Sequence, residues 1–417
     1  MRETDSFTNK TTCTISVMTK KTWLFIFFLS IAFSAWLSII FFSINRADVD
    51  EKVHYRQISR FVKGNYEILP NLTTIPGYHV VIALFSKIGG YHSLEKTRII
   101  SLALSLITIW VFFIISKRLK VNDPHIKTLQ FMFLPISFLY FPLLYTDIPS
   151  LLFVLIAFYF SIKKQYYLSA LFSLVAILTR QNNIIWIIFI WTYNYVSIYG
   201  FSISMAKIIA YLRLTIAHIG IFAAFALFLF FNHGVAIGDK TNHVAGLYLG
   251  NIYLFLAITG LLFLPIIITS TFHKINLCKT KKFLAFGLGA GFLLASSFVL
   301  FPPQLHNGNL KLTFLMNIVL KYAYGEYAYL YAIAIFLGCI FIFIAKIEKT
   351  NLLFLPFAAL YLAPSFLVAQ RYSIIPLVFL LLFKKETDKK SELVLLVYFL
   401  ILSLALIYIV FNTAIDF

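Results

Sequence analysis

The sequence predicts an all-α membrane protein that crosses the bilayer many times. Hydrophobic residues make up 61% of the 417 residues, and charged residues make up only 12%. Apolar runs of about 15 residues or more recur along the whole chain, and a helix of about 20 apolar residues spans a bilayer. Basic residues gather in short clusters between these runs, as they do in cytoplasmic loops.

The charge balance is strongly basic, with 35 Lys and Arg against 16 Asp and Glu and a net charge of +19. In a soluble protein this balance would indicate nucleic-acid binding. Here the basic clusters separate apolar runs, so we predict membrane lipid, and no nucleic acid, as a partner. The cysteines Cys13, Cys278 and Cys339 lack the spacing of a disulfide framework or a zinc site, and we predict no metal and no cofactor.

We predict a cytoplasmic tail over residues 1–21 and a single transmembrane domain over residues 22–417. The first apolar run, Trp23–Ile44, is long enough to span, and no small-residue cleavage site follows it, so it is not a removable signal. It leads to a first outer loop at residues 45–75, with room for one or two short helices. The later apolar segments bring the prediction to about 12–14 spans. They lie at roughly 76–90, 99–116, 128–146, 148–162, 166–179, 184–199, 214–232, 246–270, 283–301, 328–345, 351–368, 372–383 and 393–412.

The charge rule conflicts with this count at one place. Counting crossings from the first outer loop places the basic cluster Lys117–Lys127 outside, although such clusters prefer the cytoplasmic side. Either one early segment fails to cross fully, or this cluster is an exception to the rule.

The first outer loop carries a concentrated acidic group, because Asp48, Asp50 and Glu51 fall within four positions. A spacing of three places Glu51, His54 and Gln57 on one face of a helix. A carboxylate held near a membrane interface beside these groups can accept a proton from a sugar hydroxyl. The alternative is a solvated helix start, with acids near the positive end of the helix dipole.

Two arginines interrupt apolar sequence. Arg180, Gln181 and Asn182 stand between two apolar segments, and Arg371 and Tyr372 stand between two others. An arginine at membrane depth needs an anionic partner, and its planar fork can hold a phosphate through two hydrogen bonds. The alternative for Arg180 is an ordinary turn between two spans.

Two further polar segments allow both a structural and a functional interpretation. Asp147 follows the aromatic run that ends at Tyr145, and it can cap the next helix or face a substrate. Asp239, Lys240 and His243 belong to a compact polar loop that suits a polyhydroxyl ligand, although its Gly-Asp start is also turn chemistry. We expect these acids to share one side of the membrane with the acidic loop, because a transferase must gather them at one site.

Five of these segments follow one another in an order that resembles a known family. The family's patterns are DE-x-x-H-x-x-Q with TT-x-PG-Y, LYYTD, RQTNI-x-W, GDK-x-x-H and RY-x-x-P. The residues that match them are Asp50, Glu51, His54, Gln57, Thr73, Thr74, Pro76, Gly77, Tyr78, Leu144–Asp147, Arg180–Trp186, Gly238–Lys240, His243, Arg371, Tyr372 and Pro376. The chain departs from the family at Glu67–Pro70, where a Trp-Asp-Pro is usual, and at Pro302–Tyr331, which lacks a clear LADNRHY counterpart. The family is the endoplasmic-reticulum α-1,2-glucosyltransferases, which add the terminal glucose of the lipid-linked oligosaccharide for N-glycosylation.

The resemblance implies a GT-C glycosyltransferase fold with a luminal active site in the endoplasmic-reticulum membrane. It implies dolichyl-phosphate glucose as the donor and the diglucosylated lipid-linked oligosaccharide as the acceptor. Because that donor is β-linked and the product is α-linked, the reaction inverts and needs one base and stabilisation of the leaving phosphate. The implied base is Asp50 or Glu51, with Asp50 the first choice because related GT-C enzymes commonly use an acid in this loop. The implied substrate-binding residues are His54, Gln57, Thr73, Thr74, Tyr145, Asp147, Arg180, Gln181, Asn182, Asp239, Lys240, His243, Arg371 and Tyr372.

Two other functions stay open from the sequence. One is a divergent transferase, of the inner membrane if bacterial, that uses another polyprenyl-phosphate sugar and another acceptor. The other is a transporter or a flippase of lipid-linked sugars, for which an internal repeat and charges in mid-helix would be typical. The polar clusters lie mainly at the ends of apolar segments, which favours the enzyme.

Overall fold

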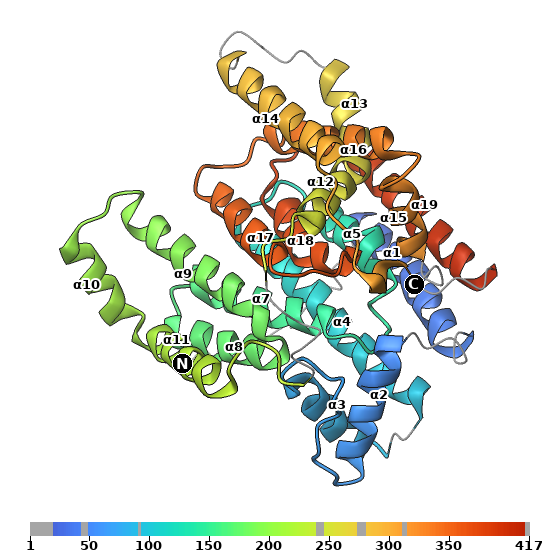
Figure 1. The fold of residues 1–417 in the computed structure, drawn as a ribbon, viewed down its shortest axis with the longest axis vertical. Coiled ribbons are helices and arrows are strands. Elements are labelled where there is room, and N and C mark those ends of the chain that lie inside the picture. Colours follow the sequence, from blue (N-terminus) through green and yellow to red (C-terminus); the bar gives the residue numbers. More distant parts are fainter. Residues whose placement is uncertain are drawn as a thin grey trace, which may run out of the picture.

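The structure is a computed structural model that describes residues 20–42, 49–90, 93–238, 246–272, 281–310 and 315–412. All regular secondary structure in these ranges is helical (Figure 1), which confirms the predicted all-α class. The α-helices are α1 (Lys20–Phe42), α2 (Val49–Val62), α3 (Gly77–Ile88), α4 (Leu94–Arg118), α5 (Pro124–Met132), α6 (Pro135–Phe138), α7 (Asp147–Ile162), α8 (Tyr166–Thr179), α9 (Ile184–Tyr199), α10 (Met205–Leu214), α11 (Ile216–Asn232), α12 (Gly250–Leu262), α13 (Leu264–Phe272), α14 (Lys281–Leu300), α15 (Leu315–Ala323), α16 (Ala328–Ile344), α17 (Phe354–Leu362), α18 (Ile374–Phe383) and α19 (Lys389–Asn412). Short 3-10 turns are η2 (Gln181–Asn183), η3 (Asn307–Leu310), η4 (Asn351–Leu353) and η5 (Gln370–Ser373).

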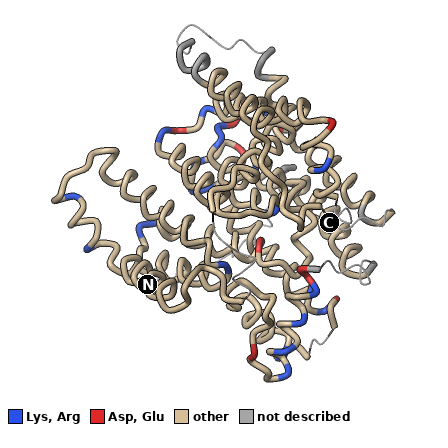
Figure 2. The backbone as a smooth tube through the Cα atoms, in the orientation of Figure 1, with Lys and Arg blue, Asp and Glu red and all other residues tan. Residues whose placement is uncertain are grey.

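The described helices include three that are long and apolar enough to cross a membrane: Thr22–Phe41, Leu94–Arg118 and Lys389–Ile409. The number rises to five if the bent pairs α10–α11 and α15–α16 each form one span. Other apolar helices have 10–17 residues, fewer than the roughly 20 of a single straight span. Long stretches of the tube in Figure 2 carry no charged residue. The chain is a multi-pass membrane protein, and the total of about 12–14 spans stays a prediction.

The short helix α3 begins and ends at the same end of the molecule. Just before it, the Ile75 amide donates to Gln181 Oε1 (3.1 Å), and early in α4, Arg98 donates to Glu51 (2.8 Å). Asp50 and Arg180, which precede Glu51 and Gln181 in the sequence, line one cavity. Helices α2 and α3 pack against each other (Figure 1). The early apolar segment at 76–90 forms α3, a helix of 12 residues, fewer than the roughly 20 of a single straight span, and both explanations for the charge conflict stay open.

A buried polar cluster joins α5 to the segment that links α18 and α19. Lys127 is only 1% exposed and donates to the backbone carbonyl of Lys384 (3.2 Å). The ammonium of Lys384 in turn pairs with Glu392 (2.7 Å). The basic clusters at Lys117–Lys127 and Lys384–Lys390 thus lie together at one end of the molecule, as the positive-inside rule requires.

The apolar run at 128–146 is not one span, contrary to the prediction. It forms α5, then α6, and then an irregular stretch up to Thr146, because Pro135 and Pro142 cannot continue a helix. Irregular backbone in a membrane protein needs internal hydrogen-bond partners, and neighbouring side chains provide them. The donors and their acceptor carbonyls are Trp36 to Phe138 (2.9 Å), Ser105 to Phe141 (2.7 Å) and Ser101 to Leu143 (2.7 Å). This stretch delivers Tyr145 and Asp147 to the site described next.

Candidate active site

The ends of several helices enclose a polar cavity of about 360 Å³. Its walls come from the start of α2, the loop before α3, the residue before α7, the residue after α8, and the segment that leads into η5. The predicted site residues that line it are Asp50, His54, Thr73, Thr74, Arg180, Arg371 and Tyr372. The structure therefore gathers residues from the acidic loop and both arginine segments at one place.

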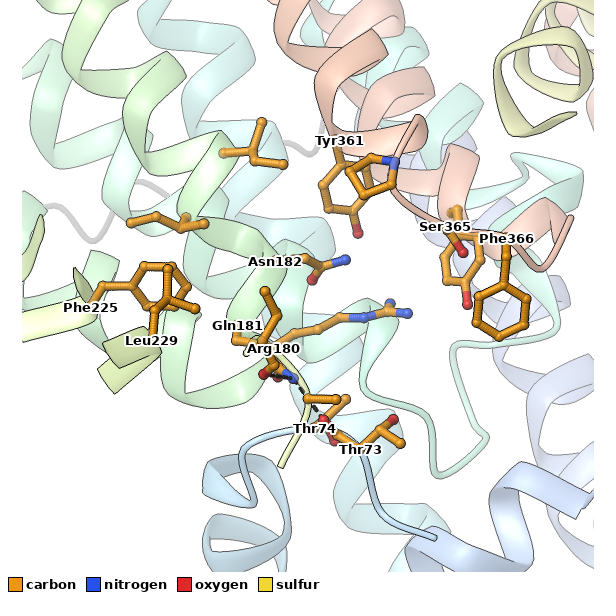
Figure 3. Close-up of a pocket in the computed structure, with 16 residues that line it drawn as sticks. Thr73, Thr74, Arg180, Gln181, Asn182, Phe225, Leu229, Tyr361, Ser365 and Phe366 are labelled. Carbon is orange, nitrogen blue, oxygen red and sulfur yellow. Dashed lines mark hydrogen bonds between the residues drawn. The ribbon is translucent and has the colours of Figure 1, made fainter. Parts of the chain in front are cut away.

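A second cavity, of about 390 Å³, adjoins the first and has an amphipathic lining (Figure 3). Ile184 and Ile185 of α9 and Phe225 and Leu229 of α11 form an apolar side. In Figure 3, the polar side chains of Arg180 and Asn182 lie between Phe225 and Leu229 on one side and Ser365 and Phe366 on the other. The residues common to the polar cavity and this amphipathic cavity are Thr73, Thr74, Arg180, Ser365, Phe366 and Tyr372.

Two ion pairs set the electrostatics of the polar cavity. Arg371 Nη1 lies 2.6 Å from Asp50 Oδ2, and Arg180 pairs with Asp147. Both guanidinium groups also stack against the ring of Tyr372, at 5.5 and 5.3 Å from its centroid. The Arg371 guanidinium lowers the pKa of Asp50 below its ordinary value, outweighing the opposite effect of burial. The carboxylate is therefore ionised at neutral pH, as a proton acceptor must be.

Three predicted site residues have a buried polar atom without a hydrogen-bond partner among the described residues. These atoms are Thr74 Oγ1, Asp147 Oδ2 and Asn182 Oδ1. Most buried polar atoms in proteins are hydrogen-bonded, so each unpaired one needs an explanation. Thr74 and Asn182 line the cavities, and Asp147 pairs with an arginine that does. These unpaired atoms suit a polar ligand that forms hydrogen bonds with them.

Glu51 lies in a different environment from its neighbour Asp50. It is 1% exposed, and its carboxylate accepts hydrogen bonds from Arg98 Nε (2.8 Å) and from the Leu144 amide (3.0 Å). It lines neither cavity. Glu51 therefore ties α2 to α4 and to the segment before α7, and this placement favours Asp50 over Glu51 as the proton acceptor. Arg98 was not predicted as its partner.

Two predicted glutamines hold loops in place. Gln57 donates to the Glu67 carbonyl (3.0 Å) and accepts from the Leu69 amide (2.7 Å), outside both cavities. Gln181 lines the amphipathic cavity, donates to the Thr73 carbonyl (2.7 Å) and accepts from the Ile75 amide (3.1 Å). The two side chains shape the loop that carries Thr73 and Thr74.

Of the remaining predicted residues, Tyr145 lies in the part of the chain that the structure describes, and three others do not. Tyr145 stacks on Arg371, whose guanidinium lies 5.7 Å from its ring centroid. Asp239, Lys240 and His243 fall outside the described residues. The described ranges contain no group of three or more His, Cys, Asp or Glu that could hold a metal ion.

One residue at the site was missed from the sequence. His79, in the first turn of α3, lies with its Nε2 atom 2.9 Å from Nδ1 of His54. Burial lowers the pKa of His54 to about 4, so its ring is neutral at pH 7. His79 follows the recognisable Gly77–Tyr78 segment, but no spacing pointed from it to His54.

The chain was compared with known proteins and structures. Residues 44–199 and 193–382 match the family model for the DIE2/ALG10 family. A relative from Candida glabrata, named Dol-P-Glc:Glc(2)Man(9)GlcNAc(2)-PP-Dol alpha-1,2-glucosyltransferase, is 24% identical over 264 residues, which are 56% of this chain and 49% of the relative. Relatives of the same name from Yarrowia lipolytica and Debaryomyces hansenii are 26% and 21% identical, covering 49% and 82% of this chain and 45% and 83% of their own lengths.

A solved structure also resembles this one in part. It is ArnT from Cupriavidus metallidurans bound to undecaprenyl phosphate, with a TM-score of 0.40, 13% identity, and coverage of 82% of this chain and 64% of that chain. The chain spans about half the length of the first curated relatives that it matches. The family model, by contrast, covers most of the chain without a gap. The chain belongs to the DIE2/ALG10 family.

Proposed function

We propose that the chain is an inverting α-1,2-glucosyltransferase. It moves glucose from dolichyl-phosphate glucose to the diglucosylated lipid-linked oligosaccharide, within a GT-C architecture in the endoplasmic-reticulum membrane. The observation that carries this proposal is the meeting of one accessible carboxylate, Asp50, with Arg371 and Arg180 in the polar cavity, where Arg180 also borders the amphipathic cavity. The relatives described above are named for this same reaction, which supports the proposal.

The amphipathic cavity suits the donor. A polyprenyl-phosphate sugar has an apolar tail, an anionic phosphate and a polar sugar in that order. The isoleucines of α9 with Phe225 and Leu229 can contact the tail, and Arg180 can bind the phosphate with Asn182 beside it. A transferase also needs room for the acceptor sugar on the other side of the glucose, and the adjoining polar cavity provides it.

Asp50 is the proposed general base. It accepts the proton of the acceptor hydroxyl, while the new bond forms at C1 of glucose and the bond from C1 to the phosphate oxygen breaks. Dolichyl phosphate leaves, and the guanidinium groups of Arg180 and Arg371 stabilise the charge that develops on it. The attack comes from the side of C1 opposite to the phosphate, so a β-linked donor gives an α-linked product.

The orientation is part of the proposal. The site lies at the luminal side and the paired basic clusters face the cytosol, which the positive-inside rule supports. Residues 1–21 then form a cytoplasmic tail, and residues 22–417 form a single transmembrane domain with the first luminal loop at 45–75.

The test is a transfer assay with the purified full chain in lipid nanodiscs, dolichyl-phosphate [14C]glucose and the diglucosylated acceptor. Asp50→Asn keeps the shape and removes the proton acceptor, so the rate should fall by about 10²–10⁴-fold. Glu348→Gln is the matched control, because its carboxylate is 62% exposed and pairs with Lys385 away from the site. Absence of transfer by the unaltered chain, or its use of only another polyprenyl-phosphate sugar, would refute the proposed reaction; donor translocation without transfer would indicate a flippase.

A further inference from the structure

Two histidines form a buried pair at the wall of the polar cavity. His54 comes one helical turn after Asp50 on α2, and His79 comes from the first turn of α3. The rings are 8% and 0% exposed by residue, with Nδ1 of His54 2.9 Å from Nε2 of His79. The proposed reaction uses Asp50 and the arginines and leaves this pair without a role.

The environment of the pair fixes the ring of His54. Tyr78 and Tyr145 contact it edge to face, with centroid distances of 6.4 and 6.0 Å. The start of α3 has little freedom, because a Cβ on Gly77 would lie 2.5 Å from the Leu178 carbonyl oxygen of α8. His79 is therefore held against His54 by close packing of two helices as well as by the shared hydrogen bond.

One assignment of donor and acceptor in this hydrogen bond agrees with the surroundings of the two rings. Both rings are buried, which favours neutral imidazoles that each carry one proton. Nδ1 of His79 is buried and has no hydrogen-bond partner among the described residues, and the Pro76 carbonyl is the backbone group that favours a proton on this ring. We assign that proton to Nδ1, because Nε2 faces His54; in this tautomer Nε2 of His79 accepts and Nδ1 of His54 donates.

This assignment determines what His54 presents to the cavity. Its single hydrogen bond to a described residue uses Nδ1. The other nitrogen, Nε2, then carries a lone pair and no proton, and the side chain lines the polar cavity beside Asp50. A bare imidazole nitrogen accepts a hydrogen bond from a hydroxyl.

We propose that His79 is a positioning residue that holds His54 in one tautomer, so that Nε2 of His54 accepts a hydrogen bond from a hydroxyl of the acceptor sugar next to Asp50. The inference rests on the proposed glycosyl transfer and adds the orientation of the acceptor to it. In many enzymes a carboxylate behind a catalytic histidine orients its ring; here the neutral imidazole of His79 would orient the ring of His54 in the same way.

Substitutions at His79 separate this role from simple packing. His79→Gln places an amide oxygen near the position of Nε2 and keeps an acceptor for His54. His79→Leu fills a similar volume and removes it, so His54 is free to change tautomer and to turn. We expect kcat/KM for the acceptor to fall by about 10- to 100-fold in His79→Leu, as a lost orienting contact does. His79→Gln should stay within about threefold of the unaltered chain, and the KM for the donor should change little in either variant.

A double-mutant cycle with His54→Phe completes the test. If His79 acts through His54, His79→Leu has little further effect once His54 is replaced, and the two losses are not additive. Equal losses in His79→Gln and His79→Leu, additive losses in the cycle, or an unchanged acceptor kcat/KM in His79→Leu would each overturn the inference. An unaltered chain that transfers no glucose would instead overturn the proposed function, so the two failures are distinguishable.

Discussion

Asp50 Oδ2 lies 2.6 Å from Arg371 Nη1, so the proposed base and a proposed phosphate ligand are held together as one ion pair. A weakly basic carboxylate is a poor proton acceptor, and the arginine keeps it weakly basic. An arriving phosphate competes with Asp50 for the same guanidinium. Under the proposed reaction, donor binding would release the base, and the acceptor hydroxyl would be deprotonated only when a donor is in place.

The first prediction concerns the pH dependence of the reaction. Arg371 is the largest cause of the lowered pKa of Asp50, with smaller contributions in the same direction from His54 and Arg180. Activity requires the ionised carboxylate, so it falls as the pH drops through this pKa. Arg371→Gln should raise the pKa of Asp50 and move the acidic limb of the kcat/KM profile to higher pH, in profiles that begin below the ordinary pKa of an aspartate and extend to neutral pH. Superimposable limbs in the variant and the unaltered chain would contradict the pairing in solution.

The second prediction concerns the lipid phosphate. Arg180→Lys and Arg371→Lys keep a positive charge but lose the planar fork that binds two phosphate oxygens. We expect the KM for dolichyl-phosphate glucose to rise by about tenfold in at least one variant, the equivalent of one lost hydrogen bond to a charged group. Steady-state kinetics with varied donor measures it, with Lys117→Arg as a control at the far end of α4. An unchanged donor KM in both lysine variants would exclude this role.

The third prediction separates Glu51 from Asp50. Glu51 and Arg98 are 1% and 0% exposed, and removal of the carboxylate takes the ion pair away from a buried guanidinium. Glu51→Ala should lower the free energy of unfolding by about 3–5 kcal/mol, whereas Asp50→Asn should lower the rate and leave stability nearly unchanged. Thermal unfolding in detergent measures the difference.

An exposed ion pair provides the control for that comparison. Lys385 and Glu348 are 56% and 62% exposed and 3.2 Å apart, so Lys385→Ala should cost less than about 1 kcal/mol. If Glu51→Ala is as stable as Lys385→Ala but inactive, Glu51 has a chemical role instead of a structural one.

The fourth prediction concerns the loop that borders both cavities. Asn251 on α12 donates to the Ser365 and Leu367 carbonyls (3.1 and 2.9 Å) and accepts from the Ala369 amide (3.0 Å). Asn309 in η3 donates to the Val368 carbonyl (2.8 Å) and accepts from its amide (3.2 Å). These contacts fix the backbone that leads to Arg371.

Substitution of either asparagine should therefore impair both substrates together. Asn251→Ala and Asn309→Ala should raise the KM for donor and acceptor alike, each by about 5- to 30-fold, because buried backbone groups lose their partners. Asn412→Ala, which removes only a hydrogen bond to the Tyr408 carbonyl within the exposed end of α19, is the control. An effect on only one substrate would argue against a loop that serves both cavities.

Local spacing along the sequence was a good guide to what lies on one helix. The spacing of three predicted that Glu51, His54 and Gln57 lie on one helix, and all three lie on α2, although only His54 lines a cavity. The isolated arginines predicted anionic partners, which are Asp147 and Asp50. Pairs that join distant segments, such as Glu51 with Arg98 and His54 with His79, depend on how α2, α3 and α4 meet. Helix periodicity contains no information on that meeting, so these partners could not be predicted.

The prediction of spans failed for a related reason. Hydropathy measures what a segment contacts, and an irregular buried chain contacts the same apolar atoms as a helix does. The stretch from Phe133 to Thr146 is apolar because it is buried, while its two prolines and the side-chain donors of neighbouring helices decide that it is not one continuous helix. Only the partners of its carbonyl groups, which lie on α1 and α4, distinguish the two cases.

The wall shared by the two cavities has a consequence for how the proposed activity can change. Thr74 and Tyr372 border both spaces, so a larger or smaller side chain at either position alters the proposed donor and acceptor compartments at once. A variant selected for another lipid-linked sugar would meet a reshaped acceptor compartment as well. Donor preference and acceptor preference are therefore coupled traits in this chain, and a change of one through this wall requires a compensating change elsewhere.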